Sequence, residues 1–256
     1  MLYSQIIGEG SKELLVIHGL FGSGDNWKSL AKNWCLRCDL KIHLLDLRNH
    51  GNSFWSDQMD FCHMSQDISN YAELHNLKEI NLLGHSLGGR VAMYFASNNP
   101  SIVKQLIVVD IGPGAQPSRN DQTFLGLEEV MLHALETRKE ADRILKQYID
   151  SFAIRLFLLR NLYYNHNKQL EFSINVRGIS KNREILTRPL NIKSIPFLET
   201  YLIRGENSKH CPPTDIHLIR KCFPKAQLIT IKNAGHWVHA DNPNDFTDQF
   251  VKVMNA

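Results

Sequence analysis

The sequence predicts an α/β fold in which a mostly parallel central sheet carries helices on both faces. Short apolar runs that end at glycine, asparagine or aspartate alternate with segments whose apolar residues recur at helical spacing. The connections between these segments are short, and strands that alternate with helices usually form a parallel sheet covered on both sides. A chain of 256 residues is long enough for one sizeable domain of this kind.

The elements can be placed in order along the chain. Strands are expected at residues 13–17, 41–45, 80–83, 105–109, 198–203 and 226–231. A helical pattern begins at Trp27, and another helix is expected to follow Ser86 directly. Residues 64–74 are expected to form a helix capped by Ser65, Asp67 or a nearby polar residue, and residues 245–254 the final helix.

The pattern changes between residues 113 and 190. Strand-like runs nearly vanish there, and residues 124–148 and 152–162 have the pattern of amphipathic helices. Such an insertion is expected to lie over the core as a helical cap, which divides the chain into a core of residues 1–112 and 191–256 and a cap of residues 113–190. An ordinary helical layer of the core remains an alternative, because short apolar helices look alike in sequence.

Composition excludes several classes of protein. The formal charge of +3 comes without a basic cluster, so we expect no nucleic-acid partner. No apolar run approaches the length of a membrane span, and the mean hydropathy is −0.27. Five cysteines without framework spacing favour free thiols in the cytoplasm. Cys35 and Cys38 form a C-x-x-C pair, but this pair precedes a strand and no second pair completes a metal site.

The segment Gly84-His85-Ser86-Leu87-Gly88 joins an expected strand to an expected helix. In a G-x-S-x-G turn the serine lies at the apex in a strained conformation, and the glycines leave room for neighbouring backbone. The helix that follows directs its free N–H groups toward whatever the serine attacks. We therefore interpret Ser86 as a candidate nucleophile, while tight packing of a glycine-rich turn is the alternative.

The expected carboxyl ends of the strands supply the partners of this serine. His236 follows the last strand and is the candidate base, since it comes after the serine and the acid in the chain. The N–H of Leu87 and that of Leu20 or Phe21 are the candidate oxyanion donors. Four other histidines are given lesser roles: His18 and His50 as braces of their loops, His85 in packing and His239 at the surface or behind the base.

Two residues compete for the role of the acid. The usual position is the loop after residues 198–203, where this chain has Glu206 but no aspartate. Asp110 directly ends the buried strand that follows the serine helix, and a carboxylate there can also reach the histidine. We favour Asp110; the alternative is that Asp110 is a simple turn residue before Gly112 and Pro113.

Five motifs together resemble the YbfF-type esterases of the α/β-hydrolase superfamily. They are HGLFGSGDNW at 18–27, DLRNHGNS at 46–53, GHSLGG at 84–89, VVDIGP at 108–113 and GHWVHADNP at 235–243. The resemblance implies the α/β-hydrolase fold with a helical cap, and Ser86, His236 and Asp110 as the catalytic triad. It also implies that the substrates are carboxylic esters or acyl-coenzyme A thioesters. Because serine hydrolysis uses only side chains and water, we expect no cofactor or metal.

Substrate choice and rival functions remain open at this level. Three arginines of the expected cap, Arg155, Arg160 and Arg177, are candidates to meet an anionic substrate, although such arginines commonly solvate a helix face. The rivals are a C–C hydrolase or a menaquinone-pathway lyase, whose acid usually lies near Glu206, and a non-catalytic receptor on the same fold. Nothing in the sequence indicates an oligomeric state.

Overall fold

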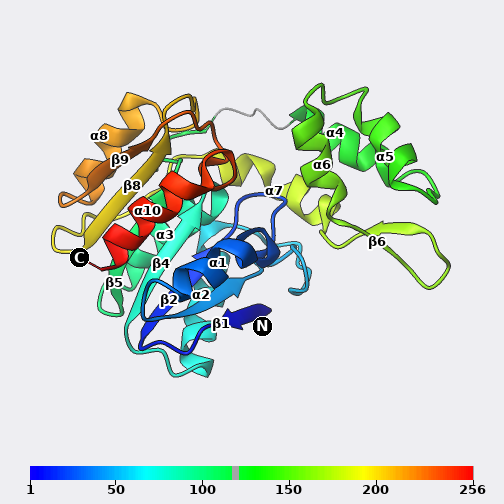
Figure 1. Ribbon diagram of the computed structural model, residues 1–256. Helices are drawn as coiled ribbons and strands as arrows, with labels where there is room; N and C mark the ends of the chain where they lie inside the picture. Colours follow the sequence, from blue (N-terminus) through cyan, green and yellow to red (C-terminus); the bar gives the residue numbers. More distant parts are fainter. Residues whose placement is uncertain (117–120, 256) are drawn as a thin grey trace.

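The computed structural model describes residues 1–116 and 121–255, and within them seven strands form one central sheet in the order β1-β3-β2-β4-β5-β8-β9 (Figure 1). The strand β1 runs antiparallel to β3, and the other neighbouring pairs are parallel. The strands are β1 (Ser4–Ile7), β2 (Lys12–Ile17), β3 (Leu40–Leu45), β4 (Ile80–His85), β5 (Val103–Val109), β8 (Glu199–Gly205) and β9 (Gln227–Ile231). The predicted α/β architecture is confirmed.

Helices cover both faces of this sheet, as its alternating side chains require. Leu14 and Val16 of β2 pack in one apolar cluster with α1 (Lys28–Cys35) and α10 (Pro243–Met254). Leu15 and Ile17 pack in a second cluster on the opposite face, with α2 (Phe61–Leu74), α3 (Leu87–Asn98) and α8 (Pro213–Cys222). Two short helices, η1 (Gly24–Trp27) and α9 (Val238–Asp241), lie in loops after β2 and β9.

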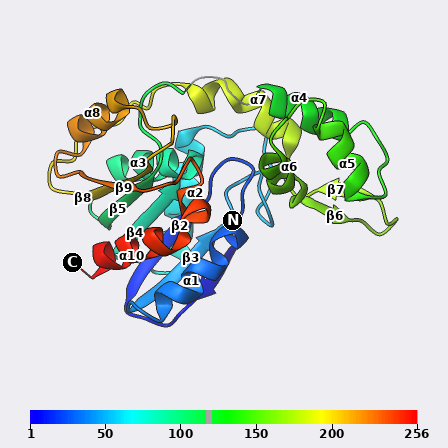
Figure 2. The same ribbon diagram turned by 45° about the horizontal axis from the view of Figure 1, so that its top comes forward.

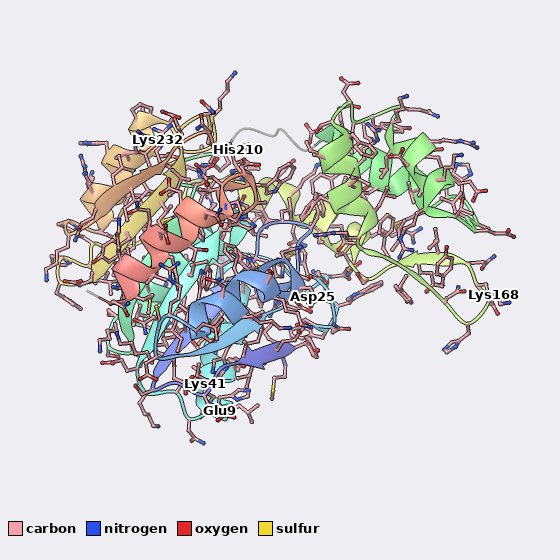
Figure 3. The ribbon with its side chains drawn as sticks, viewed as in Figure 1. Glu9, Asp25, Lys41, Lys168, His210 and Lys232 are labelled. Atoms are coloured by element: carbon pink, nitrogen blue, oxygen red, sulfur yellow. The ribbon has the colours of Figure 1, made fainter. Side chains whose placement is uncertain are left out.

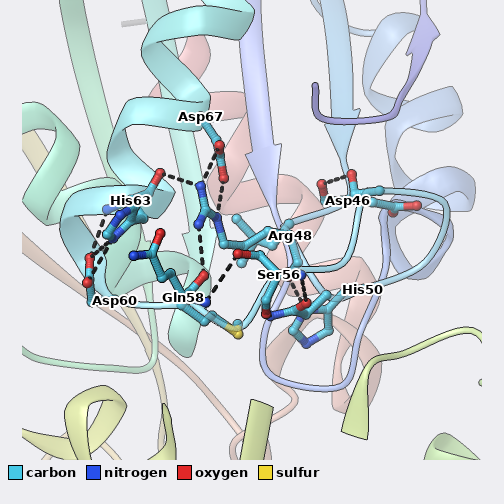
Figure 4. A network of polar contacts seen from close by, with 12 residues as sticks. Asp46, Arg48, His50, Ser56, Gln58, Asp60, His63 and Asp67 are labelled. Atoms are coloured by element: carbon cyan, nitrogen blue, oxygen red, sulfur yellow. Dashed lines mark hydrogen bonds and ion pairs between the residues drawn. The ribbon is translucent and has the colours of Figure 1, made fainter. Parts of the chain in front are cut away.

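The helix α2 begins earlier than the sequence indicated, and its cap is Asp60. The Asp60 carboxylate accepts a hydrogen bond from the His63 N–H at 2.9 Å, which satisfies a free donor of the first turn. Asp67, one of the expected caps, instead lies within the helix and binds Arg48. Figure 4 shows this pair, in which the guanidinium also donates to the carbonyl oxygens of Gln58 and His63.

The helices between residues 121 and 159 stand to one side of the sheet in both ribbon views, and α7 runs back from them toward the core (Figures 1 and 2). We call residues 121–187 the cap; its role as a separate lid stays a prediction. The cap contains α4 (Asp121–Val130), α5 (Arg138–Leu145), α6 (Phe152–Leu159), α7 (Val176–Thr187) and a hairpin of β6 (Leu162–Tyr164) and β7 (Leu170–Phe172). Lys168 lies at the tip of that hairpin (Figure 3). Residues 117–120 of the expected cap and residue 256 of the expected core lie outside the described residues.

Two helix predictions in the cap were wrong in extent. Residues 124–148 form α4 and α5 rather than one helix, because Thr137 and Glu140 make a capping box that starts α5. The helix expected over 152–162 ends at Leu159, and Leu162 already pairs with Phe172 in the hairpin.

One buried arginine joins the core to both connections of the cap. Arg90 of α3 is 2% exposed, and it donates from Nη1 to the Gly114 carbonyl oxygen at 2.8 Å and from Nη2 to that of Arg188. The two connections also bond to each other, through Gln116 N–H to the Thr187 carbonyl oxygen at 2.8 Å. The helix that starts at the candidate nucleophile therefore also holds the base of the cap.

Candidate active site

The turn between β4 and α3 presents Ser86 at the carboxyl edge of the sheet. Ser86 has φ 53° and ψ −120°, a conformation that side-chain-bearing residues rarely adopt. A Cβ on Gly84 would lie 2.2 Å from the Gly88 carbonyl oxygen, and one on Gly88 would lie 2.3 Å from that of Ile17. The glycines are therefore required by backbone packing. Leu87 is the first residue of α3, so its N–H has no partner within the helix.

Three side chains from three strand ends form one chain of hydrogen bonds. His236, in the loop after β9, has Nε2 3.0 Å from Ser86 Oγ and Nδ1 2.8 Å from Asp110 Oδ2. Because a carboxylate accepts, the Nδ1–H donates to Asp110 and leaves the Nε2 lone pair facing the serine hydroxyl. The structure thus brings together the three residues expected as nucleophile, base and acid.

Asp110 is fully buried and is held by the last residue of β8 and by the loop that follows it. Its carboxylate accepts hydrogen bonds from the Gly205 N–H at 3.0 Å and from the Ser208 hydroxyl. Burial raises the pKa of Asp110, and these two hydrogen bonds oppose that shift. Glu206, the competing acid, is exposed and accepts from the Asn233 N–H at 3.0 Å. The contacts therefore favour Asp110 as the partner of His236.

The imidazole of His236 is packed between other rings. The ring of His210, which is labelled in Figure 3, stacks on it with centroids 3.7 Å apart. On the backbone side, His85 Nε2 donates to the His236 carbonyl oxygen at 2.9 Å. His239 stacks on Trp27 at 4.1 Å, and burial lowers its pKa well below the usual value. Ser208 and His210 were not singled out from sequence; their place in the loop where the acid usually lies was the available signal.

The loop after β2 is held by hydrogen bonds from the loop after β3. His18 Nε2 accepts from the Leu47 N–H at 3.0 Å, and His50 Nε2 accepts from the Phe21 N–H at 3.1 Å (Figure 4 shows His50 and Asp46). Asp46 accepts from the Gly24 N–H at 2.7 Å. Burial lowers the pKa of His18 to about 4 and that of His50 to about 3, so both rings are neutral acceptors at neutral pH.

This bracing separates the two candidates for the second oxyanion donor. The Phe21 N–H is already engaged by His50, whereas Gly19, next to Leu20, lies so close to the nucleophile that a Cβ on it would be 3.2 Å from Ser86 Cβ. The Leu20 N–H is therefore the better placed partner for the Leu87 N–H. The sequence left Phe21 as the alternative donor, but its N–H already donates to His50 Nε2.

A cavity of about 1300 Å³ opens above Ser86 and His236. The cap contributes an apolar wall that includes Phe124, Ile154, Phe157 and Leu158. Arg160 and Arg183 also line this cavity, whereas Arg177 is not among its described lining residues. Arg155 is buried and binds Asp142 at 2.7 Å and nearby carbonyl oxygens, so this arginine stabilises the cap itself.

Two features are absent from the residues with described positions. No group of three or more His, Cys, Asp or Glu side chains among them is arranged to hold a metal ion. None of their helices combines the length and apolar character needed to cross a membrane.

A family model described as the alpha/beta hydrolase fold matches residues 13–243. The chain belongs to this family. This α/β-hydrolase is 35% identical over 261 residues to the Mus musculus protein named sn-1-specific diacylglycerol lipase ABHD11, covering 98% of the chain and 84% of that protein. It is 28% identical over 243 residues to Esterase YbfF of Escherichia coli K12, covering 94% and 92%, so the resemblance noted from the motifs is confirmed.

A solved structure titled marine microorganism esterase matches the α/β-hydrolase with a TM-score of 0.90 and 35% identity. The alignment covers 98% of each chain, cap included. The fold and the esterase class of the enzyme are thus supported by whole-chain comparisons.

Proposed function

We propose that this α/β-hydrolase cleaves carboxylic esters through an acyl-enzyme formed on Ser86. The observation that carries the proposal is the hydrogen-bond chain from Ser86 Oγ through His236 to the buried Asp110, at the floor of a cavity with an apolar wall. A serine, a correctly oriented imidazole and a buried carboxylate are the parts that acyl transfer requires.

Each residue has one task in the reaction. As Ser86 Oγ attacks the ester carbonyl carbon, His236 Nε2 takes the hydroxyl proton, and Asp110 stabilises the imidazolium through Nδ1–H. The N–H groups of Leu87 and Leu20 donate to the oxyanion, each contributing a factor of about 10² to 10³ in rate. His236 then protonates the departing alcohol, and water repeats the sequence on the acyl-enzyme.

The cap is proposed to act as the lid and to supply the acyl-binding wall. Phe124, Ile154 and Phe157 give the cavity an apolar surface on the cap side, which supports substrates with an extended acyl chain. The mouse relative is named a diacylglycerol lipase, and glycerol esters therefore belong among the substrates to be tested.

Thioesters of coenzyme A are a second substrate class within the same chemistry. The proposal of this class is supported by Arg160 and Arg183, which line the cavity, because guanidinium groups bind phosphate oxygens well. A cytoplasmic location is part of the proposal and is supported by five cysteines that are all free.

The rival functions are less well supported. A C–C hydrolase or a menaquinone-pathway lyase usually places its acid near Glu206. Here Glu206 accepts from the Asn233 N–H, and Asp110 is the carboxylate that lies 2.8 Å from His236 Nδ1. A receptor on this fold would retain product and turn over slowly.

The experiment is turnover of a graded series of p-nitrophenyl esters, diacylglycerols and acyl-coenzyme A thioesters by the wild type and by Ser86→Ala. We expect hydrolysis by the wild type and its collapse in Ser86→Ala, with the chain-length profile reporting the size of the cavity. Full turnover of every active substrate by Ser86→Ala would overturn the proposal, and tight retention of product with little turnover would favour the receptor.

A further inference from the structure

We propose that Asn161 of the cap is a positioning residue that holds the oxyanion loop in its active conformation. The inference rests on the proposed esterase mechanism. Asn161 follows α6 and is 7% exposed, and its Nδ2 donates to the Phe21 carbonyl oxygen at 2.9 Å and to that of Leu158 at 3.2 Å. Through this amide, the cap directly bonds the loop that carries the Leu20 donor.

Phe21 needs support of this kind because its backbone is unfavourable. Its φ is 60°, in the left-handed region, where a bulky residue is strained and persists only when its surroundings fix it. The core holds one side, since His50 accepts from the Phe21 N–H at 3.1 Å. Asn161 holds the other side at the carbonyl oxygen, and Phe124 of the cap packs edge-on against the ring with centroids 5.2 Å apart.

Asn161 is itself fixed, so it can impose a position on the loop. Its N–H donates to the Leu158 carbonyl oxygen at 3.0 Å, and its own carbonyl oxygen accepts from the Ser173 N–H at 2.7 Å and from the Ser173 hydroxyl at 3.1 Å. The Asn161 amide thus extends from a segment that is hydrogen-bonded both to the end of α6 and to Ser173, the residue after β7. If the cap moves away, the Phe21 carbonyl oxygen loses this donor and the strained turn beside Leu20 can relax.

The consequence is that the oxyanion hole is complete only when the cap packs against the core and Asn161 bonds the Phe21 carbonyl oxygen. Binding of the ground-state ester depends mostly on the apolar wall, whereas the Leu20 N–H contributes when negative charge develops on the carbonyl oxygen. Loss of the Asn161 amide should therefore lower kcat and leave KM nearly unchanged. Misplacing one donor by a fraction of an ångström is expected to lower kcat about 10- to 100-fold.

A matched control exists elsewhere in the cap. Asn182 of α7 is also 7% exposed, and its amide likewise joins the cap to the core, bonding the Met59 N–H at 3.2 Å and the Asp57 carbonyl oxygen at 2.8 Å. It has no contact with Phe21 among the described hydrogen bonds. Asn182→Leu therefore measures the effect of losing a buried amide between cap and core without disturbing the loop that carries Leu20.

The test compares Asn161→Leu with Asn182→Leu in kcat, KM and inhibition by a trifluoromethyl ketone, which forms a tetrahedral adduct with the serine. We expect Asn161→Leu alone to lose kcat and inhibitor affinity by similar factors, at equal folded fractions. If either leucine variant fails to fold, Asn161→Asp and Asn182→Asp keep the side-chain size and repeat the comparison.

Equal kinetics for the two variants, or a change in KM without a change in inhibitor affinity, would overturn the positioning role. A wild type that hydrolyses no ester, or an unimpaired Ser86→Ala, would instead overturn the proposed function.

Discussion

Replacing Asp110 by Asn should remove most of the activity and leave the fold intact. Asn has nearly the same shape, but its amide has one acceptor oxygen and one NH₂ donor, whereas the carboxylate has two acceptor oxygens. The Oδ1 position accepts from the Gly205 N–H at 3.0 Å, so the amide oxygen must lie there to avoid two opposed donors. The NH₂ group then faces His236 Nδ1 and the Ser208 hydroxyl.

That arrangement selects the wrong tautomer of His236. With a donor opposite Nδ1, the ring carries its proton on Nε2, which lies 3.0 Å from Ser86 Oγ and can no longer accept the hydroxyl proton. Loss of the correct tautomer in a serine triad costs about 10⁴ in kcat, equal to about 5.4 kcal/mol of transition-state stabilisation.

The assay is steady-state hydrolysis of a p-nitrophenyl ester by Asp110→Asn, with Glu206→Gln as the matched control. Glu206→Gln keeps an oxygen to accept from the Asn233 N–H, and its activity should stay within about twofold of the wild type, because an exposed carboxylate contributes little. Collapse of Glu206→Gln with retention of activity in Asp110→Asn would refute the assignment and favour the rival enzymes of this fold.

Three further changes test the scaffold around the site. Because the pKa of His50 is about 3 in the fold against 6.5 for the free side chain, the unfolded chain binds a proton first as pH falls, so stability decreases from pH 6.5 downward. His50→Gln should reduce that slope by up to about 1.4 kcal/mol per pH unit in denaturant titrations, and an unchanged slope would contradict it. Arg48→Met leaves Asp67 buried and unpaired and should lower the free energy of unfolding by about 3 to 5 kcal/mol. Lys181→Met, which removes the exposed pair with Asp57, should change it little. Equal losses in the two variants would contradict the idea that burial makes the loss of Arg48 costly. Arg90→Met should destabilise by about 2 to 4 kcal/mol and speed proteolysis at the connections to the cap, and unaltered cleavage would mean that Arg90 does not hold them.

The core and its turn were predictable because their signals are local. The buried strands are continuous apolar runs, and Gly84 and Gly88 flank Ser86 at fixed spacing, so a few neighbouring residues define the elbow. The edge strand β1 was missed, since Ser4–Ile7 is short and only partly buried. The break between α4 and α5 was signalled by Thr137 and Glu140, but the apolar pattern on both sides concealed it.

The choices within the site depend on contacts between distant residues. Sequence left Asp110 and Glu206 as rival acids, and the contact that separates them joins residues 126 positions apart. The choice between Leu20 and Phe21 likewise depends on His50, 29 positions away, whose ring engages one of the two amides. Asn161 has no motif at all, since its role depends on how the cap lies against the core.

The most direct test of the proposed chemistry is to trap the acyl-enzyme. The enzyme is mixed with a p-nitrophenyl ester, quenched with acid within the first turnovers, and analysed by intact-mass and peptide mass spectrometry. We predict a mass increase of one acyl group on the peptide that contains Ser86, and no such increase in Ser86→Ala. Turnover without any adduct on that peptide, together with full activity of Ser86→Ala, would contradict the covalent mechanism.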